Sequence, residues 1–269
     1  MGKLFTSAMA GLVLACSALA STQAMAQESA LEHIQNTGKL RVCFEAGYMP
    51  FEMKSKNGRF IGFDIDMARE MARSMGVKFV PVNTAWDGII PALQTGKCDI
   101  IMAGMTITPK RNLKVNFAHP YIVIGQTLLI SPKLKGKIRS YRDLNNAKYT
   151  IATKLGTTGN DAAKRYMPNA KLELFDTEAD AVLQVANGKA SAFVYDMPYN
   201  AIYASQHKQQ VVHLDHPFTY EPLGWAIRQH DPDFLNFLNN YLRQVRGDGT
   251  YKRIYDRWFK SSRWLKQIQ

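Results

Sequence analysis

An arginine at the start of a short predicted helix is the first residue whose placement suggests chemistry. Thr108 can cap this helix and Pro109 can occupy its first position, so Arg111 falls in the first turn. A cation is locally unfavourable there, because the N-terminus of a helix already carries partial positive charge. Arg111 is therefore either a solvated surface residue or part of a site for an anionic group.

Further polar and aromatic residues stand where predicted strands end, and together they would form a site of mixed charge. Arg111 can hold a carboxylate through two parallel hydrogen bonds, while Asp196 can accept hydrogen bonds from an ammonium group. An α-amino acid presents both charges a few ångströms apart, so this pair would complement it. The candidate ligand-binding residues are Glu45, Tyr48, Trp86, Gly104, Met105, Thr106, Arg111, Lys154, Thr157, Thr158 and Asp196.

Each candidate also has an ordinary structural alternative, which the sequence leaves open. Asp196 precedes Met197-Pro198 and could be a helix N-cap. Tyr48 and Trp86 could be core aromatics, and the loop at residues 156–159 could be a simple turn. The joint occurrence of these residues at equivalent strand ends is what favours a binding site.

The elements expected to position these residues alternate between strands and helices, as in α/β proteins. Strands are predicted at residues 40–44, 77–82, 99–103, 149–153 and 190–195. Helices are expected to begin with caps at Asp64, Asp87, Thr177 and Asp231.

The two halves of the chain repeat each other. A Gly-Lys pair precedes a predicted strand at residues 96–97 and again at residues 188–189, and aligning the two pairs places Gly104 opposite Asp196. Open α/β sheets bind ligands at the carboxyl ends of their strands. We therefore expect two similar α/β lobes whose strand-end loops face a shared cleft.

The first 26 residues are expected to be a signal peptide rather than part of the fold. Lys3 provides a positive start, an apolar run covers residues 4–20, and Ala24-Met25-Ala26 matches a cleavage site. The run is short for a membrane span of about 20 residues. The mature chain would then begin at Gln27 and be exported to the periplasm. A lipoprotein-like box ending at Cys16 is the competing interpretation, in which Cys16 carries a lipid anchor.

Charge and cysteine content narrow the remaining function classes. The formal net charge of +12 raises nucleic acid as a partner, but scattered basic residues on an exported chain favour a solvated surface, so no nucleic-acid partner is expected. Cys43 and Cys98 remain after cleavage and could form a disulfide, which the sequence leaves undecided. Neither cysteine nor any histidine has the spacing of a metal or thiol site, so no metal or other cofactor is expected.

Several motifs are shared with a single family. They are PFE at 50–52, GFDID at 62–66, WDGIIPAL at 86–93, AGMTITPKR at 103–111, YDMP at 195–198 and DGTY at 248–251. On these motifs the mature chain resembles, over nearly its whole length, the periplasmic polar-amino-acid-binding proteins of ABC importers, which are solute-binding proteins of family 3.

The resemblance implies a type II periplasmic-binding-protein fold, an α/β architecture of two lobes and two hinge segments. Lobe 1 is expected to comprise residues 27–120 and 225–269, and lobe 2 residues 126–219. Residues 121–125 and 220–224 would be the hinge segments.

The resemblance also implies roles for the candidate residues. Arg111 matches the arginine that binds the ligand carboxylate, and Asp196 matches the acceptor of the α-ammonium group. Glu45 stands where many relatives carry aspartate, and a carboxylate there favours a basic or glutamine-like ligand. The supporting residues would be the carboxylate helpers Thr106 and Thr158, the Gly104 carbonyl beside the ammonium, and the aromatic walls Tyr48 and Trp86.

The expected function is therefore the capture of a polar amino acid by lobe closure and its delivery to an inner-membrane ABC permease. The protein would act as a monomer and would not be an enzyme. The alternative is a periplasmic enzyme on the same scaffold, such as a prephenate or arogenate dehydratase, with Glu45 or another carboxylate as acid or base. No Ser-His-Asp set or metal spacing favours that alternative.

Overall fold

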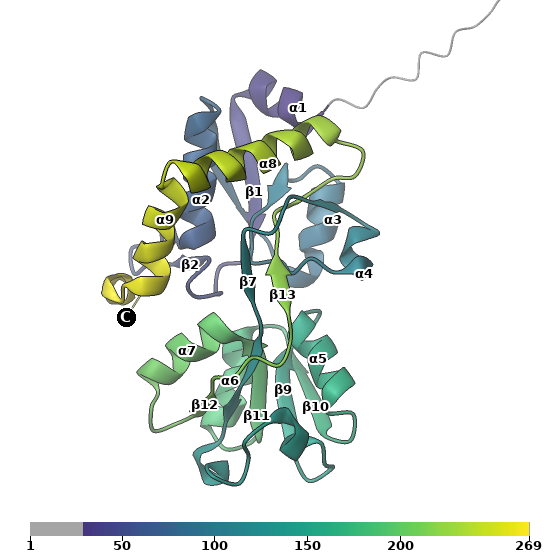
Figure 1. Cartoon of the computed structure of the whole chain (residues 1–269), viewed down its shortest axis with the longest axis vertical. Coiled ribbons are helices and arrows are strands. Elements are labelled where there is room, and N and C mark those ends of the chain that lie inside the picture. The colour runs from purple at the N-terminus through teal and green to yellow at the C-terminus, as the bar shows by residue number, and fades with distance from the viewer. Residues whose placement is uncertain (1–28, 269) are drawn as a thin grey trace, which may run out of the picture.

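The computed structural model describes residues 29–268, which fold into two α/β lobes stacked along the long axis of the molecule (Figure 1). Lobe 1, at the top of the figure, contains a sheet of order β4-β1-β5-β14-β6, and lobe 2 contains a sheet of order β10-β9-β11-β8-β12. The predicted two-lobed α/β fold is confirmed. The predicted signal peptide and the competing lipid anchor at Cys16 lie outside the described residues.

Lobe 1 is built from the N-terminal part of the chain and is completed by its C-terminal helices. Its first part contains α1 (Ala30–Thr37), β1 (Lys39–Phe44), β2 (Met53–Lys54), β3 (Phe60–Ile61), α2 (Phe63–Ser74), β4 (Lys78–Asn83), η1 (Trp86–Gly88), α3 (Ile89–Gln94), β5 (Ile100–Ile101), α4 (Pro109–Asn112) and β6 (Asn116–Phe117). Its last part contains β14 (Ala226–Ile227), α8 (Pro232–Gly247), α9 (Thr250–Tyr255), η4 (Asp256–Lys260) and η5 (Arg263–Gln267).

Lobe 2 is formed by one continuous stretch of chain. It contains β8 (Gln126–Ile130), η2 (Pro132–Leu134), η3 (Tyr141–Leu144), β9 (Thr150–Lys154), α5 (Thr158–Tyr166), β10 (Lys171–Phe175), α6 (Glu178–Ala186), β11 (Ala192–Asp196), α7 (Met197–Gln206) and β12 (Val212–Leu214). Strand β11 is buried along its whole length, as the near-continuous apolar sequence of a strand covered on both faces predicts.

The two sheets share one topology, which supports the repeat seen in the sequence. In lobe 1, β1 pairs in parallel with β4 and β5, and β14 joins β5 in the antiparallel direction. In lobe 2, β9 pairs in parallel with β10 and β11, and β8 joins β11 in the antiparallel direction. Strand β5 therefore corresponds to β11, so Gly104 and Asp196 follow or end equivalent strands, as the Gly-Lys alignment predicts.

Two strands pass between the lobes and pair with each other. They are β7 (Ile122–Ile124) and β13 (Glu221–Leu223), which form an antiparallel ribbon visible between the lobes in Figure 1. Both strands fall inside the segments predicted as hinges. The division at residues 121–125 and 220–224 stays a prediction.

Two of the four predicted helix caps are confirmed by direct side-chain contacts, and two are wrong. Thr177 Oγ1 accepts from the Asp180 N–H at 3.0 Å, and Asp231 Oδ1 accepts from the Phe234 N–H at 3.1 Å, as predicted. The cap at Asp64 is wrong. Helix α2 begins after Gly62, whose φ of +139° and close approach to the Phe51 carbonyl leave no room for a side chain.

Asp64 has long-range partners instead of a capping role. It is fully buried and accepts from the Gly104 N–H at 2.9 Å and from the Tyr121 hydroxyl at 2.8 Å. Asp87 likewise makes no capping hydrogen bond, because it lies within the 3₁₀ turn η1 that precedes α3. The two wrong caps share a cause, since both assignments used only neighbouring sequence.

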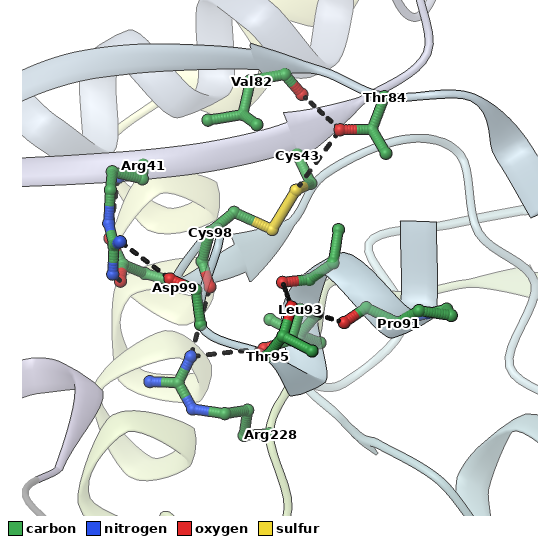
Figure 2. The surroundings of a disulfide bond; sticks show 12 residues. Arg41, Cys43, Val82, Thr84, Pro91, Leu93, Thr95, Cys98, Asp99 and Arg228 are labelled. Carbon is green, nitrogen blue, oxygen red and sulfur yellow. Dashed lines mark hydrogen bonds and ion pairs between the residues drawn. A yellow bond between two sulfur atoms is a disulfide. The ribbon is translucent and has the colours of Figure 1, made fainter. Parts of the chain in front are cut away.

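Cys43 and Cys98 form a disulfide, which settles the pairing left open by the sequence (Figure 2). Their Cα atoms lie 5.7 Å apart, and the bond joins β1 to the residue pair that leads into β5. A crosslink across a sequence separation of 55 residues stabilises the fold by about 4 kcal/mol, mainly by restricting the unfolded chain.

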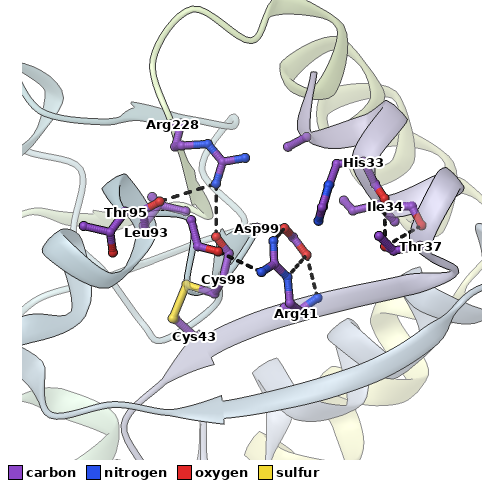
Figure 3. Close-up of polar contacts among 12 residues, drawn as sticks. His33, Ile34, Thr37, Arg41, Cys43, Leu93, Thr95, Cys98, Asp99 and Arg228 are labelled. Atoms are coloured by element: carbon purple, nitrogen blue, oxygen red, sulfur yellow. Dashed lines mark hydrogen bonds and ion pairs between the residues drawn. A yellow bond between two sulfur atoms is a disulfide. The ribbon is translucent and has the colours of Figure 1, made fainter. Parts of the chain in front are cut away.

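Charged residues next to the disulfide fix the same pair of strands (Figure 3). Arg41 Nη2 lies 2.5 Å from Asp99 Oδ1, and the Arg41 backbone N–H donates to Asp99 Oδ2 at 2.8 Å. Arg228 Nη1 donates to the Cys98 carbonyl at 3.2 Å. These contacts hold β1 against the residues that lead into β5. Arg41, Arg228 and Asp99 therefore have a structural role, away from the loops at the strand ends.

Within residues 29–268, no helix is both long enough and apolar enough to cross a membrane.

Candidate functional site

A cavity between the lobes collects the strand-end residues. Its empty space, open mouth included, measures about 380 Å³. All the candidate residues except Met105 line it. Met105 is 1% exposed in the core of lobe 1, so its side chain does not reach the cavity. Glu52, Ala103 and Tyr195 also line the cavity; they lie in the shared motifs but were not among the candidate residues.

Asp196 points its carboxylate into the cavity. It occupies the N-cap position of α7, as the structural alternative proposed, but its side chain makes no capping bond. Oδ2 accepts from the hydroxyl of Tyr48 in lobe 1, and Oδ1 accepts from Gln126 Nε2 at 2.5 Å. Burial raises the pKa of Asp196 to about 7, although the hydrogen bonds from Tyr48 and Gln126 act in the opposite direction.

Arg111 is held at the cavity wall by carbonyl groups and an aromatic ring. Thr108 caps α4 and accepts from the Arg111 N–H at 3.2 Å, as predicted. Arg111 Nη1 donates to the Thr106 carbonyl at 2.9 Å, Nη2 donates to the Gly156 carbonyl of lobe 2 at 3.3 Å, and the guanidinium lies 5.2 Å from the Trp86 ring centroid.

No carboxylate of residues 29–268 lies within ion-pair distance of Arg111. Burial lowers the pKa of this guanidinium, while Glu221 and Asp196 partly offset the effect from a distance. A partly buried cation without an adjacent anion is costly, and an incoming carboxylate would supply the missing partner.

Gly104 brings the aromatic wall close to the lobe 1 backbone. Its φ is +55°, and a Cβ built there would lie 2.2 Å from the Tyr48 ring. A residue with a side chain would therefore displace Tyr48 from the position in which its hydroxyl reaches Asp196. The predicted use of the Gly104 carbonyl for an ammonium group stays a prediction.

An acidic pair surrounds Lys154 at the other side of the cavity. Lys154 Nζ donates to Glu45 across the cleft and to Glu178 Oε2 within lobe 2, the latter at 2.8 Å. The side chains of Lys154 and Glu178 are only 3% and 5% exposed. Burial alone would lower the pKa of Lys154, but the charges and hydrogen bonds of Glu178 and Glu45 outweigh burial and raise it.

Glu52 is a further carboxyl group at the cavity, and it was not among the candidate residues. It is 1% exposed, lines the cavity, and its Oε2 has no hydrogen-bond partner among the described residues. Burial, followed by the charges of Asp64 and Glu178, raises the pKa of Glu52 well above its usual range. The direction of this shift favours the neutral form of the carboxyl.

Two more hydrogen bonds join the lobes directly across the cavity. Trp86 Nε1 donates to the Gly156 carbonyl at 3.1 Å, and the hydroxyl groups of Thr106 and Thr158 lie 3.3 Å apart. The structure therefore has the lobes closed on each other, with candidate residues of one lobe bonded to candidate residues of the other. Across the described range, no cluster of three or more His, Cys, Asp or Glu residues has the geometry of a metal site.

Comparison with known proteins agrees with this geometry. The family model described as bacterial extracellular solute-binding proteins, family 3, matches residues 40–261. The solved structure of an ABC-transporter binding component from Wolinella succinogenes, complexed with lysine, is 54% identical, with a TM-score of 0.83 over 85% of this chain and 99% of that one.

Two curated relatives differ in what they do. A probable histidine-binding protein of Neisseria gonorrhoeae is 33% identical over 91% of this chain and 93% of its own length. A cyclohexadienyl dehydratase of Pseudomonas aeruginosa is 27% identical over 92% of both chains. The same scaffold is therefore found in a binding protein and in an enzyme.

Proposed function

The chain belongs to the bacterial extracellular solute-binding proteins of family 3, and we propose that it captures a cationic amino acid in the periplasm for delivery to an ABC permease. The observation that carries this proposal is the partly buried guanidinium of Arg111, which has no carboxylate partner among the described residues and faces the same cavity as Asp196. These two groups complement the carboxylate and ammonium groups of an amino acid.

The charge balance of the cavity supports a cationic side chain on the ligand. A ligand ammonium group on Asp196 would favour its ionised form. Before Glu52 is counted, the charged groups that line or adjoin the cavity are then Glu45, Asp196 and Glu178 against Lys154 and Arg111, an excess of one negative charge. Lysine, arginine or ornithine carries a net charge of +1 and would neutralise this excess. Glutamine is neutral and would leave one buried charge without compensation. The lysine bound to the Wolinella succinogenes structure is consistent with this choice.

Lobe closure would supply the affinity. Opening about the β7–β13 ribbon would break the bonds between Tyr48 and Asp196, between Lys154 and Glu45, and from Trp86 to lobe 2. A ligand that contacts both lobes adds interactions which exist only in the closed form, so it shifts the equilibrium towards closure. The permease would then distinguish loaded from empty protein by the closed shape.

An enzyme on this scaffold is the second candidate, and Glu52 is the observation that favours it. A protonated carboxyl at a cavity wall could donate a proton, and one relative is a cyclohexadienyl dehydratase. We propose the binding function rather than a catalytic one because the ionic groups of the cavity complement an amino acid. Formation of phenylpyruvate from prephenate, or of phenylalanine from arogenate, at catalytic rates would favour the enzyme instead.

A thermal-shift screen tests the proposed function. The mature chain would be unfolded, dialysed to remove co-purified ligand, refolded, and heated with each of the twenty amino acids and ornithine. A ligand at 100 times its dissociation constant adds about 2.7 kcal/mol to the free energy of unfolding, which gives a clear rise in Tm. We expect the response to be confined to cationic amino acids. A flat response to every compound would contradict the proposal.

A further inference from the structure

Lys154 raises a difficulty for a cavity that is proposed to accept a cation. Its ammonium group lines the same cavity and is almost fully buried, so an unpaired positive charge there would repel a cationic ligand side chain strongly. Among the described residues of lobe 1, Glu45 is the carboxylate that contacts Lys154, and it is also the residue expected to receive the ligand cation. One carboxylate cannot fully compensate two cations.

Glu178 is placed to remove this difficulty. It is the first residue of α6, after the Thr177 cap, where the helix dipole stabilises a negative charge. Its Oε2 accepts from Lys154 Nζ at 2.8 Å, and its Oε1 lies against Gly47 of lobe 1, where a Cβ would come within 2.4 Å. The carboxylate therefore fills the space between Lys154 and the opposite lobe.

The two bonds of Lys154 differ in what happens when the lobes separate. The bond to Glu178 lies within lobe 2, between β9 and α6, so it would persist in an open form. The bond to Glu45 crosses the cleft and must break on opening. In the open form Lys154 would stay on Glu178, and Glu45 would be left without a cation.

We propose that Glu178 is a specificity-determining residue that neutralises Lys154 within lobe 2 and thereby reserves Glu45 for the side-chain cation of the ligand. This inference rests on the proposed function. It assigns Glu178 a positioning role, because its carboxylate acts on the ligand through Lys154.

The test compares ligand preference rather than affinity alone. Isothermal titration calorimetry would measure the dissociation constants of lysine and glutamine for the wild type and for Glu178→Gln. In the variant, Lys154 has only Glu45 as a partner, so we expect the preference for lysine over glutamine to fall at least about tenfold. Glu173→Gln, the same change at an exposed position on β10, should leave the preference unchanged.

A double variant separates the role of charge from a packing role. Replacing Lys154 by Met in the Glu178→Gln background removes the unpaired cation, so we expect the preference for lysine to recover most of what the single variant loses. Circular dichroism and Tm of each variant would verify folding. If Glu178→Gln alone does not fold, Lys154→Met is compared with the double variant instead. The two should prefer lysine equally, and a difference between them would overturn the inference, because Glu178 would then act without Lys154.

The outcomes distinguish this inference from the function on which it rests. If the wild type binds no cationic amino acid, the proposed function fails and the inference fails with it. If the wild type prefers lysine and Glu178→Gln keeps the same preference, only the inference is overturned. A loss of preference that Lys154→Met does not restore would also overturn it, because the loss would then not act through Lys154.

Discussion

The hydroxyl of Tyr48, on lobe 1, donates a hydrogen bond to the carboxylate of Asp196, on lobe 2. This contact joins the aromatic wall of the cavity to the carboxylate that we propose as the ammonium acceptor. It therefore links lobe closure to the ionic state of the ligand site. Because the Tyr48 ring also covers Gly104, the position of the hydroxyl is fixed by packing on its own lobe.

Removing this hydroxyl should weaken ligand binding without changing the fold. Tyr48→Phe keeps the ring, so stacking on Phe51 is retained, but Asp196 loses one donor and the closed form loses one interlobe bond. We expect a loss of about 1 kcal/mol in binding free energy, or roughly fivefold in the dissociation constant. Titration calorimetry measures it. An unchanged constant would show that the bond adds nothing to closure.

Ligand affinity should depend on pH through Asp196. Its pKa is about 7 in the ligand-free structure, and a bound ammonium group favours the ionised carboxylate, so binding releases a proton below pH 7. Affinity should therefore fall as the pH decreases from 7 to 5, approaching about tenfold per pH unit, and become constant above about pH 8. Titrations in two buffers of different ionisation enthalpy would detect the released proton.

A control is needed because Asp64 also has a pKa of about 7. Asp64 does not line the cavity and accepts from Gly104 and Tyr121 inside lobe 1. Proton release on binding should therefore persist in Asp64→Asn. Its disappearance in that variant would assign the pH dependence to Asp64 instead of Asp196.

Arg111 should be essential for binding and dispensable for folding. In Arg111→Met the ligand carboxylate would be buried without its partner, so we expect a loss of about 3 kcal/mol or more in binding free energy, which is roughly 100-fold or greater in affinity. The ligand-free protein should keep its Tm or gain stability, because a partly buried cation with no adjacent carboxylate is removed. Arg139→Met, on the exposed surface of lobe 2, is the matched control and should retain normal affinity.

The disulfide should contribute to stability and not to ligand choice. Both cysteines are fully buried in lobe 1, so replacing them together by alanine removes the crosslink without exposing a polar group. We expect a loss of about 4 kcal/mol, which corresponds to a decrease in Tm of roughly 10 °C. The order of preference among amino acids should stay the same. A double variant with the Tm of the wild type would contradict this role.

Local patterns in the sequence were sufficient for much of the fold. The caps at Thr108 and Thr177 depend on residues three positions away, and the Gly-Lys repeat placed Gly104 and Asp196 at the ends of equivalent strands. The cap assigned to Asp64 failed because its partners are 40 and 57 positions away along the chain. No local pattern distinguishes an aspartate that caps a helix from one that is buried against another segment.

The same contrast between local sequence patterns and long-range contacts applies to the candidate site. Arg111 and Asp196 were found because each follows a recognisable strand end, and both line the cavity. Glu178 was missed because glutamate after a threonine cap is ordinary at a helix start, and only the fold brings it to Lys154. Glu52 was missed because nothing in its neighbouring sequence marks a glutamate that the fold buries at the cavity. Met105 was included for its neighbours in the motif, yet its side chain packs into the core.

The measurement that tests the central claim most directly is calorimetric titration of the refolded mature chain with lysine, repeated with Arg111→Met. The account predicts saturable binding of one lysine per chain, binding of glutamine at least about tenfold weaker, and a signal that Arg111→Met reduces below detection. Absence of lysine binding to the folded wild type, or equal binding by Arg111→Met, would contradict it.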